Sequence, residues 1–90
     1  GTIDIPTALT PNGDGNNDAL FVKGIGIDNM QLLIYNRWGE LVFETNNYMV
    51  GWDGTFKGNM QPMEVYVYYL IGDFADTNTF ERKGNITLLR

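Results

Sequence analysis

The sequence predicts an all-β fold of the sandwich type, on three observations. Short strand-like runs recur between clusters of Gly, Asn, Asp and Pro, a spacing that is typical of a β-sandwich. No stretch longer than a turn repeats its apolar residues at the helical period. The 90 residues are enough for one domain, and a hydrophobic content of 43% is sufficient for one packed core.

The first predicted strands lie in the N-terminal third of the chain. Residues 2–5 alternate between polar and apolar types and then meet Pro6, which lacks a backbone donor and therefore indicates an edge strand. Residues 20–23, Leu-Phe-Val-Lys, form the next predicted strand and follow directly on a loop rich in Asn, Asp and Gly.

A β-hairpin is the clearest local prediction. Residues 30–35 place three apolar side chains on one face, those of Met30, Leu32 and Ile34. Residues 40–44 alternate again, and residues 36–39, Asn-Arg-Trp-Gly, connect the two strands. Gly39 is predicted to adopt the positive φ that such a turn requires.

The second half of the chain contains a long connection followed by the strongest strand. Residues 45–62 are rich in Asn and Gly and are predicted to form a connection with at most a short strand at 55–57. Tyr48 and Trp52 are expected to pin this connection to the core. Residues 65–71 are apolar or aromatic at every position, which indicates a strand in the centre of its sheet.

Two further strands are predicted towards the end of the chain. A turn at 75–78 leads into a strand at 79–83, and Gly84-Asn85 is expected to break the chain before a last strand at 86–90. A terminus that forms part of a sheet is ordered, so the side chain and carboxylate of Arg90 would be displayed in a fixed place.

Composition excludes several classes of function. The net charge is −5 and the basic residues are scattered, which argues against a nucleic-acid-binding protein. The chain has no Cys, His or Ser, and it therefore lacks the usual nucleophiles and the commonest general base, so an enzyme is not expected. The longest apolar run, residues 65–71, is far shorter than the roughly 20 residues of a membrane-spanning helix.

The loop at 10–18, Thr-Pro-Asn-Gly-Asp-Gly-Asn-Asn-Asp, has two interpretations. Side-chain oxygens stand at every second position, on Asn12, Asp14, Asn16 and Asp18. In a calcium site these oxygens would bind the cation together with backbone carbonyls or with Asp53. Ala19 and Ile25 stand where an EF-hand has Gly and Glu, which excludes that motif. In an Asx-turn cage the same side chains would accept hydrogen bonds from N–H groups of the loop.

Other residues are candidates for contact with a partner. Arg37 and Trp38 stand at the tip of the predicted hairpin, and Arg and Trp dominate interface hot spots. In the alternative interpretation the indole covers the sheet edge with Arg37 stacked on it. Trp52 is expected to be buried and to precede a turn at Asp53-Gly54. The tyrosines at 66, 68 and 69 form either core contacts or an aromatic platform for sugars or peptides.

Five motifs follow one another along the chain. They are Thr-Pro-Asn-Gly-Asp-Gly-x-Asn-Asp at 10–18, Ile-Tyr-Asn-Arg-Trp-Gly at 34–39, Val-Phe-Glu at 42–44, Trp-Asp-Gly at 52–54 and Gly-x-Ile-Thr-Leu-x-Arg at 84–90. Together they resemble the gliding motility-associated C-terminal domain of Bacteroidetes surface proteins, a CHU_C-like domain also called the type B sorting domain of the type IX secretion system. The resemblance covers about the whole chain, and one departure is Glu64, where the family usually has Gly.

The resemblance implies an Ig-like antiparallel β-sandwich of about seven strands. It implies a single C-terminal sorting domain over residues 1–90, with 1–7 as a linker or edge strand. The cargo would be a large protein that enters the periplasm through a separate N-terminal signal, crosses the outer membrane and ends on the cell surface or in the medium.

The resemblance also names the partners. The outer-membrane translocon of the type IX system and a protein of the PorP/SprF type would recognise the folded domain, which is expected to be monomeric and to require no cofactor. Recognition is expected at the C-terminal strand, through Ile86, Leu88 and Arg90, and at the hairpin tip, through Arg37 and Trp38. The loop at 12–18 is a further candidate, either for recognition or for calcium.

Two other functions compete with a non-catalytic sorting signal. The first is an adhesive module that binds glycan or protein through Trp38, Trp52 and the tyrosines. The second is a structural cap that calcium stabilises through the loop at 12–18. The three hypotheses differ in the change that would abolish the predicted property. Export would require the secretion system, binding of glycan or protein would require Trp38, and the stability of the cap would require calcium.

Overall fold

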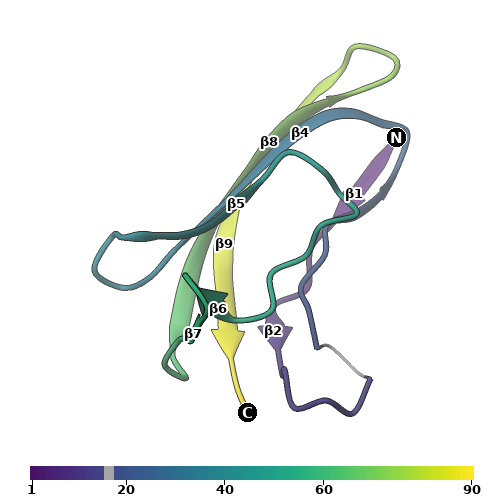
Figure 1. The fold of residues 1–90 in the computed structure, drawn as a ribbon. Helices are drawn as coiled ribbons and strands as arrows, with labels where there is room; N and C mark the ends of the chain where they lie inside the picture. The colour runs from purple at the N-terminus through teal and green to yellow at the C-terminus, as the bar shows by residue number, and fades with distance from the viewer. Residues whose placement is uncertain (16–17) are drawn as a thin grey trace.

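The computed structural model describes residues 1–15 and 18–90, and this part of the chain is all-β (Figure 1). The strands within it are β1 (Thr2–Asp4), β2 (Ala8–Leu9), β3 (Lys23–Ile25), β4 (Ile27–Tyr35), β5 (Leu41–Thr45), β6 (Thr55–Phe56), β7 (Asn59–Met60), β8 (Val65–Phe74) and β9 (Thr79–Leu88). The prediction of an all-β sandwich is confirmed. The number of strands exceeds the expected seven because several are only two or three residues long.

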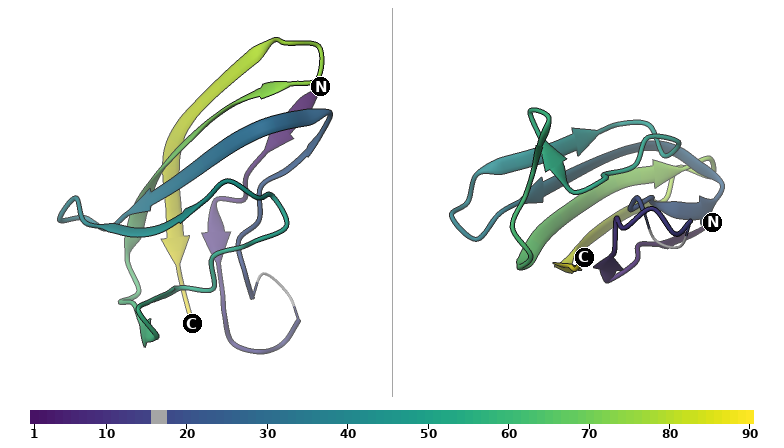
Figure 2. Two further views of the ribbon diagram at one scale, coloured as in Figure 1. Left: turned by 45° about the horizontal axis from the view of Figure 1, so that its top comes forward. Right: turned by 60° about the horizontal axis from the view of Figure 1, so that its bottom comes forward.

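Five strands form the main sheet, in the order β2-β9-β8-β4-β5. Figures 1 and 2 show β4, β8 and β9 side by side as one long twisted sheet. The central position predicted for residues 65–71 is confirmed, because β8 pairs with β4 on one side and with β9 on the other. One pair departs from the antiparallel expectation: β2 runs parallel to β9.

Two short ribbons and their connections form the second layer. β1 pairs with β3, and β6 pairs with β7. The edge strand predicted at 2–5 is therefore present as β1, and Ile5 beyond it is buried. The expectation of at most one short strand within 45–62 was too low, because Lys57 and Gly58 adopt positive φ and turn the chain into a second short strand.

The core lies against one face of the main sheet. Side chains of β4, β8 and β9 alternate, and those that face the core are Met30, Leu32, Ile34, Tyr66, Tyr68, Leu70, Ile86 and Leu88. Leu9 of the edge strand β2 joins them, and Leu20, Val22 and Trp52 of the second layer complete the core. The face predicted for residues 30–35 is thus confirmed, and Trp52 is buried as expected, with its indole N–H donating to the Thr55 carbonyl at 2.9 Å.

The hairpin between β4 and β5 is also confirmed. Asn36 is buried, and its side-chain oxygen accepts hydrogen bonds from the backbone N–H groups of Trp38 and Glu40, each at 2.9 Å. Gly39 has a φ of 79°, the left-handed conformation that the turn requires. The tip of this hairpin is therefore held by its own side-chain hydrogen bonds.

The predicted break at Gly84-Asn85 is wrong. β9 runs without interruption from Thr79 to Leu88. The ring of Tyr68 explains the glycine, because a methyl group placed on Gly84 would lie 2.8 Å from its Cε2 atom. Gly84 therefore accommodates an aromatic neighbour on the adjacent strand rather than ending its own strand.

Two predictions about the second layer are also wrong. The strand expected at 20–23 is reduced to an isolated bridge between Leu20 and Trp52, and the regular strand begins only at Lys23. Tyr48 does not pin the connection to the core, since 53% of its surface is exposed. Of Tyr48 and Trp52, it is Trp52 that anchors this segment, through its buried indole and its two backbone hydrogen bonds with Leu20.

Candidate functional site

The hairpin tip presents a large aromatic side chain to solvent. Trp38 is 77% exposed, so its indole does not cover the sheet edge as the alternative interpretation proposed. The guanidinium of Arg37 lies over this indole, 4.7 Å from the ring centroid. Arg37 Nε also lies 3.3 Å from a carboxylate oxygen of Glu64, a residue of the segment before β8. The ion pair and the stacked ring together limit the positions that Arg37 can adopt.

The residues around Tyr66 belong to the same end of the sheet. Tyr66 is fully buried, and its hydroxyl donates to the carbonyl of Pro62 at 2.7 Å. Burial raises the pKa of Tyr66 to about 12, and the negative charge of Glu64 acts in the same direction. The positive charge of Arg90 acts in the opposite direction, so both side chains lie within electrostatic reach of this hydroxyl.

The C-terminal strand β9 does not display the apolar side chains through which recognition was predicted. Ile86 and Leu88 are 0% exposed and face the core, so their side chains are not available to a partner. The regular strand ends at Leu88, and the N–H of Leu89 donates to the carbonyl of Leu9 at 2.8 Å. Of the residues predicted for recognition at the C-terminal strand and the hairpin tip, Arg37, Trp38 and Arg90 present exposed side chains.

The loop before Ala19 is organised by one carboxylate. Asp18 accepts three backbone hydrogen bonds: from the N–H groups of Asn12 and Gly13 on Oδ1, at 3.1 and 2.9 Å, and from Gly15 on Oδ2, at 2.8 Å. The side-chain oxygen of Asn12 accepts from the N–H of Asp14 at 3.1 Å. The cage of Asx hydrogen bonds predicted for this loop is therefore present, and Asn16 lies outside the described residues.

Asp53 has a local role of the same kind. Its Oδ1 accepts from the N–H and the hydroxyl of Thr55, at 3.1 and 2.7 Å, and Gly54 between them has a φ of 85°. The predicted turn after Trp52 is thus confirmed. Within residues 1–15 and 18–90, no three His, Cys, Asp or Glu residues cluster in a way that could hold a metal ion. Calcium at this loop stays a prediction.

The structure shows a surface that the sequence did not indicate. The face of the main sheet that points away from the core carries a hollow of about 720 Å³, which Leu33, Tyr35, Val67, Tyr69 and Ile71 line together with residues of the hairpin. The predicted platform of three tyrosines is not present, because Tyr66 and Tyr68 are buried and only Tyr69 of the three is exposed. We call the apolar strip that Leu33, Tyr35, Val67, Tyr69 and Ile71 form on β4 and β8 the outer trough.

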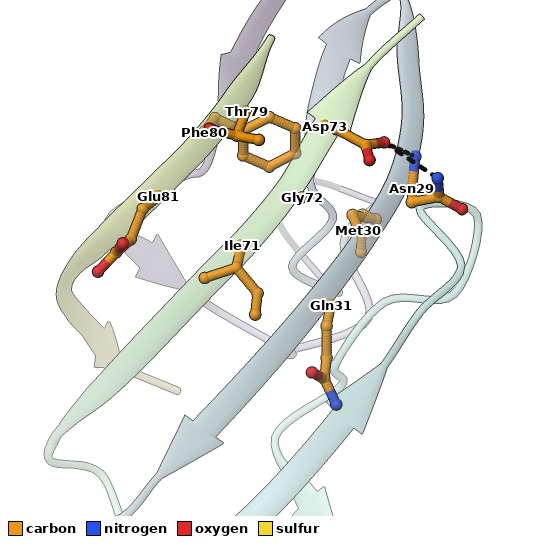
Figure 3. A pocket seen from close by; sticks show the side chains of 9 residues that line it. All are labelled: Asn29, Met30, Gln31, Ile71, Gly72, Asp73, Thr79, Phe80 and Glu81. Carbon is orange, nitrogen blue, oxygen red and sulfur yellow. Dashed lines mark hydrogen bonds between the residues drawn. The ribbon is translucent and has the colours of Figure 1, made fainter. Parts of the chain in front are cut away.

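A second hollow, with a mixed apolar and polar lining, lies at the other end of β4 and β8 (Figure 3). Ile71 lines both hollows. Beyond it, Oδ1 of Asp73 accepts hydrogen bonds from the N–H and the side-chain amide of Asn29, both at 3.0 Å, and Glu81 adds a second carboxylate to this end. A partial sequence signal for this face lies in β9, where the polar residues Glu81, Lys83 and Asn85 stand at every second position, although Arg82 between them is exposed as well.

Comparison with known proteins identifies the class of the domain. Residues 3–88 match the CHU_C type IX secretion signal domain, and no curated protein matches the chain. The part of the chain that the structure describes holds no helix that could span a membrane. A type IX secretion signal domain is a sorting signal that interacts with the secretion system and is generally non-catalytic, and its presence implies export to the cell surface or the medium. Because the match extends over nearly all of its residues, the chain belongs to the CHU_C type IX secretion signal family.

Proposed function

We propose that this domain delivers a large cargo protein through the outer-membrane translocon of the type IX secretion system, which recognises it in its folded form. The observation that carries the proposal is the match of residues 3–88 to a secretion signal domain. The fold supports it, because a packed sandwich with hydrogen-bonded turns loses little conformational entropy when it docks. Recognition by shape also suits a step outside the cytoplasm.

The hairpin tip is the proposed contact for the translocon or for a partner of the PorP/SprF type. Trp and Arg are the residue types that most often dominate binding energy at interfaces. Here the exposed indole of Trp38 stacks with Arg37, and Glu64 holds Arg37 at 3.3 Å. The turn beneath them is fixed by Asn36. Both side chains are thus oriented before a partner arrives, which lowers the entropic cost of binding.

A reporter fusion tests the proposal as a whole. Residues 1–90 are fused behind a reporter that carries a periplasmic export signal, in cells with and without a working type IX system. We expect the reporter to reach the cell surface or the medium only where the translocon is present. Equal export from a translocon-deficient strain would refute the proposed function, and so would retention of the fusion in the periplasm of wild-type cells.

Substitutions in the same fusion test the hairpin tip. We expect Trp38→Ala to reduce export strongly while the melting temperature of the isolated domain stays within a few degrees of wild type, because an exposed side chain contributes little to folding. Tyr48→Ala is the matched control, since Tyr48 is also exposed but lies in the connection before Trp52. Wild-type export of the Trp38→Ala fusion would exclude the tip as the contact.

The adhesive alternative rests on fewer residues than the sequence indicated. Trp52, Tyr66 and Tyr68 are buried, which leaves Trp38 and Tyr69 as the exposed members of the aromatic set. A glycan array with the isolated domain tests this function directly. Saturable binding that disappears with Trp38→Ala and persists with Tyr48→Ala would favour adhesion over sorting.

A further inference from the structure

We propose that Asn12-Gly13 and Asp14-Gly15 are sites of spontaneous covalent modification, and that the carboxylate of Asp18 suppresses the reaction while the loop is folded. The reaction is succinimide formation, in which a backbone nitrogen attacks the side chain of the residue before it. Asn12 is the only asparagine of the sequence that a glycine follows. The reaction is a property of the loop itself and takes place with or without export.

The reaction at Asn12 needs only the chain and water. The Gly13 nitrogen gives its proton to a solvent base and forms a bond to Cγ of Asn12, and the side-chain nitrogen leaves as ammonia. Water then adds to either carbonyl of the five-membered ring, which opens to aspartate or isoaspartate at position 12. At Asp14 the Gly15 nitrogen attacks the protonated carboxyl group in the same way, and water leaves instead of ammonia.

The glycines make both dipeptides reactive. A glycine has no Cβ to obstruct the approach of its own nitrogen to the preceding side chain. Gly13 and Gly15 have φ values of 80° and 83°, and a methyl group placed on either would meet no described atom within 4 Å beyond its chain neighbours. Packing of the described residues therefore does not shield these nitrogens, and the hydrogen bonds of the loop restrain them instead.

Asp18 holds both attacking nitrogens with one carboxylate. The N–H of Gly13 donates to Oδ1 at 2.9 Å, and the N–H of Gly15 donates to Oδ2 at 2.8 Å. Hydrogen bonds to a charged acceptor are stronger than those between neutral groups, and each must break before its nitrogen can attack. The nitrogen must also lose its proton, and a negative charge on it is disfavoured directly beside a carboxylate. Both effects slow the reaction.

Asp53-Gly54 is the other Asp-Gly dipeptide of the sequence, and its surroundings differ. The Asp53 carboxylate accepts from the N–H and the hydroxyl of Thr55. Gly54 is buried, and a methyl group placed on it would lie 3.2 Å from Cδ1 of Leu88. This dipeptide is enclosed by packing, so its reactivity should depend on unfolding of the domain and not on Asp18.

The folded loop and the unfolded chain should therefore differ in reactivity at Asn12. In the unfolded chain the N–H of Gly13 bonds to water, and Asp18 is no longer held beside it. Conversion at Asn12 accumulates during the time that the domain spends unfolded, and the converted fraction records that time. Isoaspartate carries the main chain through the former side chain and lengthens it by one carbon, so the modified loop cannot restore the same set of hydrogen bonds.

Peptide mass spectrometry measures the reaction. The domain is incubated at mildly alkaline pH, well below its melting temperature, and the tryptic peptide of residues 1–23 is analysed over time. Replacement of NH₂ by OH raises its mass, and chromatography separates the aspartate and isoaspartate products, whose joint appearance identifies the succinimide. We expect Asn12 of the folded wild type to convert about tenfold or more slowly than that of the same chain in guanidinium chloride.

Substitution of Asp18 tests the carboxylate itself. In folded Asp18→Ala, conversion at Asn12 and isoaspartate formation at Asp14 should accelerate about tenfold or more, whereas isoaspartate formation at Asp53 should not. Asp53→Ala is the matched control, because Asp53 also accepts two local hydrogen bonds, and its rate at Asn12 should equal that of wild type. Asp18→Asn, which keeps one oxygen without the charge, replaces Asp18→Ala if that variant does not fold, and should also accelerate conversion.

Four results would overturn the proposal. The first is conversion at Asn12 that is as fast in the folded wild type as in the denatured chain, and the second is no conversion in the denatured chain. The third is a wild-type rate at Asn12 in the folded Asp18 variant. The fourth is equal acceleration at Asn12, Asp14 and Asp53, which would show that the substitution opens the whole domain.

Discussion

Raising the pH above 10 should destabilise this domain through Tyr66 in particular. Tyr66 lies fully buried against Trp52, with ring centroids 5.0 Å apart, and its hydroxyl donates to the Pro62 carbonyl at 2.7 Å. Burial first, and the charge of Glu64 second, raise the pKa of Tyr66 from 10.0 to about 12. The folded state therefore keeps the phenolic proton at a pH where the unfolded chain has lost it.

The sign and the size of the effect follow from this difference. Below pH 10 both states are protonated and the stability is fully present. Between pH 10 and 12 the unfolded state binds fewer protons than the folded state, so the free energy of unfolding falls as pH rises. A pKa difference of this size corresponds to a loss of at most about 3 kcal/mol as the pH rises from 10 to 12.

Urea unfolding between pH 8 and 12, followed by tryptophan fluorescence, measures this effect. Tyr66→Phe should cost about 1 kcal/mol below pH 10, for the lost hydrogen bond, and should then become relatively more stable than wild type as the pH approaches 12. Tyr48→Phe is the control and should follow wild type at every pH. A constant difference between wild type and Tyr66→Phe from pH 8 to 12 would refute the reasoning.

Other substitutions probe the packing and the loop. Gly84→Ala should destabilise the domain by about 1–3 kcal/mol and lower its melting temperature in calorimetry, because the added methyl group meets Tyr68 at 2.8 Å. A higher melting temperature would show that the Tyr68 ring can move aside. Trp52→Phe should cost about 2–4 kcal/mol in urea unfolding, from the smaller ring and the lost hydrogen bond to Thr55, and a cost below about 1 kcal/mol would contradict the anchor role. Asp18→Ala should cost about 2 kcal/mol, since three N–H groups lose their acceptor, and unchanged stability would mean that water replaces the carboxylate. If calcium binds this loop, the melting temperature of wild type should be several degrees higher in calcium than in chelator and that of Asp18→Ala should not, whereas equal temperatures for wild type would contradict calcium binding.

Local chemistry made the hairpin and the central strand predictable. The order Asn36-Arg37-Trp38-Gly39 between two apolar runs contains both the side chain that accepts the turn hydrogen bonds and the glycine that adopts positive φ. Residues 65–71 are apolar or aromatic at every position, a run that is typical of a strand in the interior of its sheet, and β8 lies between β4 and β9. These features depend on residues close together in the sequence, so the sequence contains the whole explanation.

Contacts between distant residues explain what could not be predicted. Gly84 reads as a strand breaker until Tyr68, on the neighbouring strand, is seen to occupy the place of its side chain. Ile86 and Leu88 read as a displayed strand, because nothing local shows that β2 pairs with this strand and that both side chains face the core. The parallel pairing of β2 joins residues almost 80 positions apart, and no local pattern indicates it.

The sequence of β8 does not distinguish a strand covered on both faces from one covered on a single face. A strand that is apolar at every position can be covered on both faces or on one, and the sequence of β8 is the same in either case. The neighbouring strand decides, since Glu81, Lys83 and Asn85 of β9 pair with Ile71, Tyr69 and Val67 and lie on the exposed face. The apolar side chains of β8 on this face thus lie beside exposed polar side chains of β9, and this face is not part of the core.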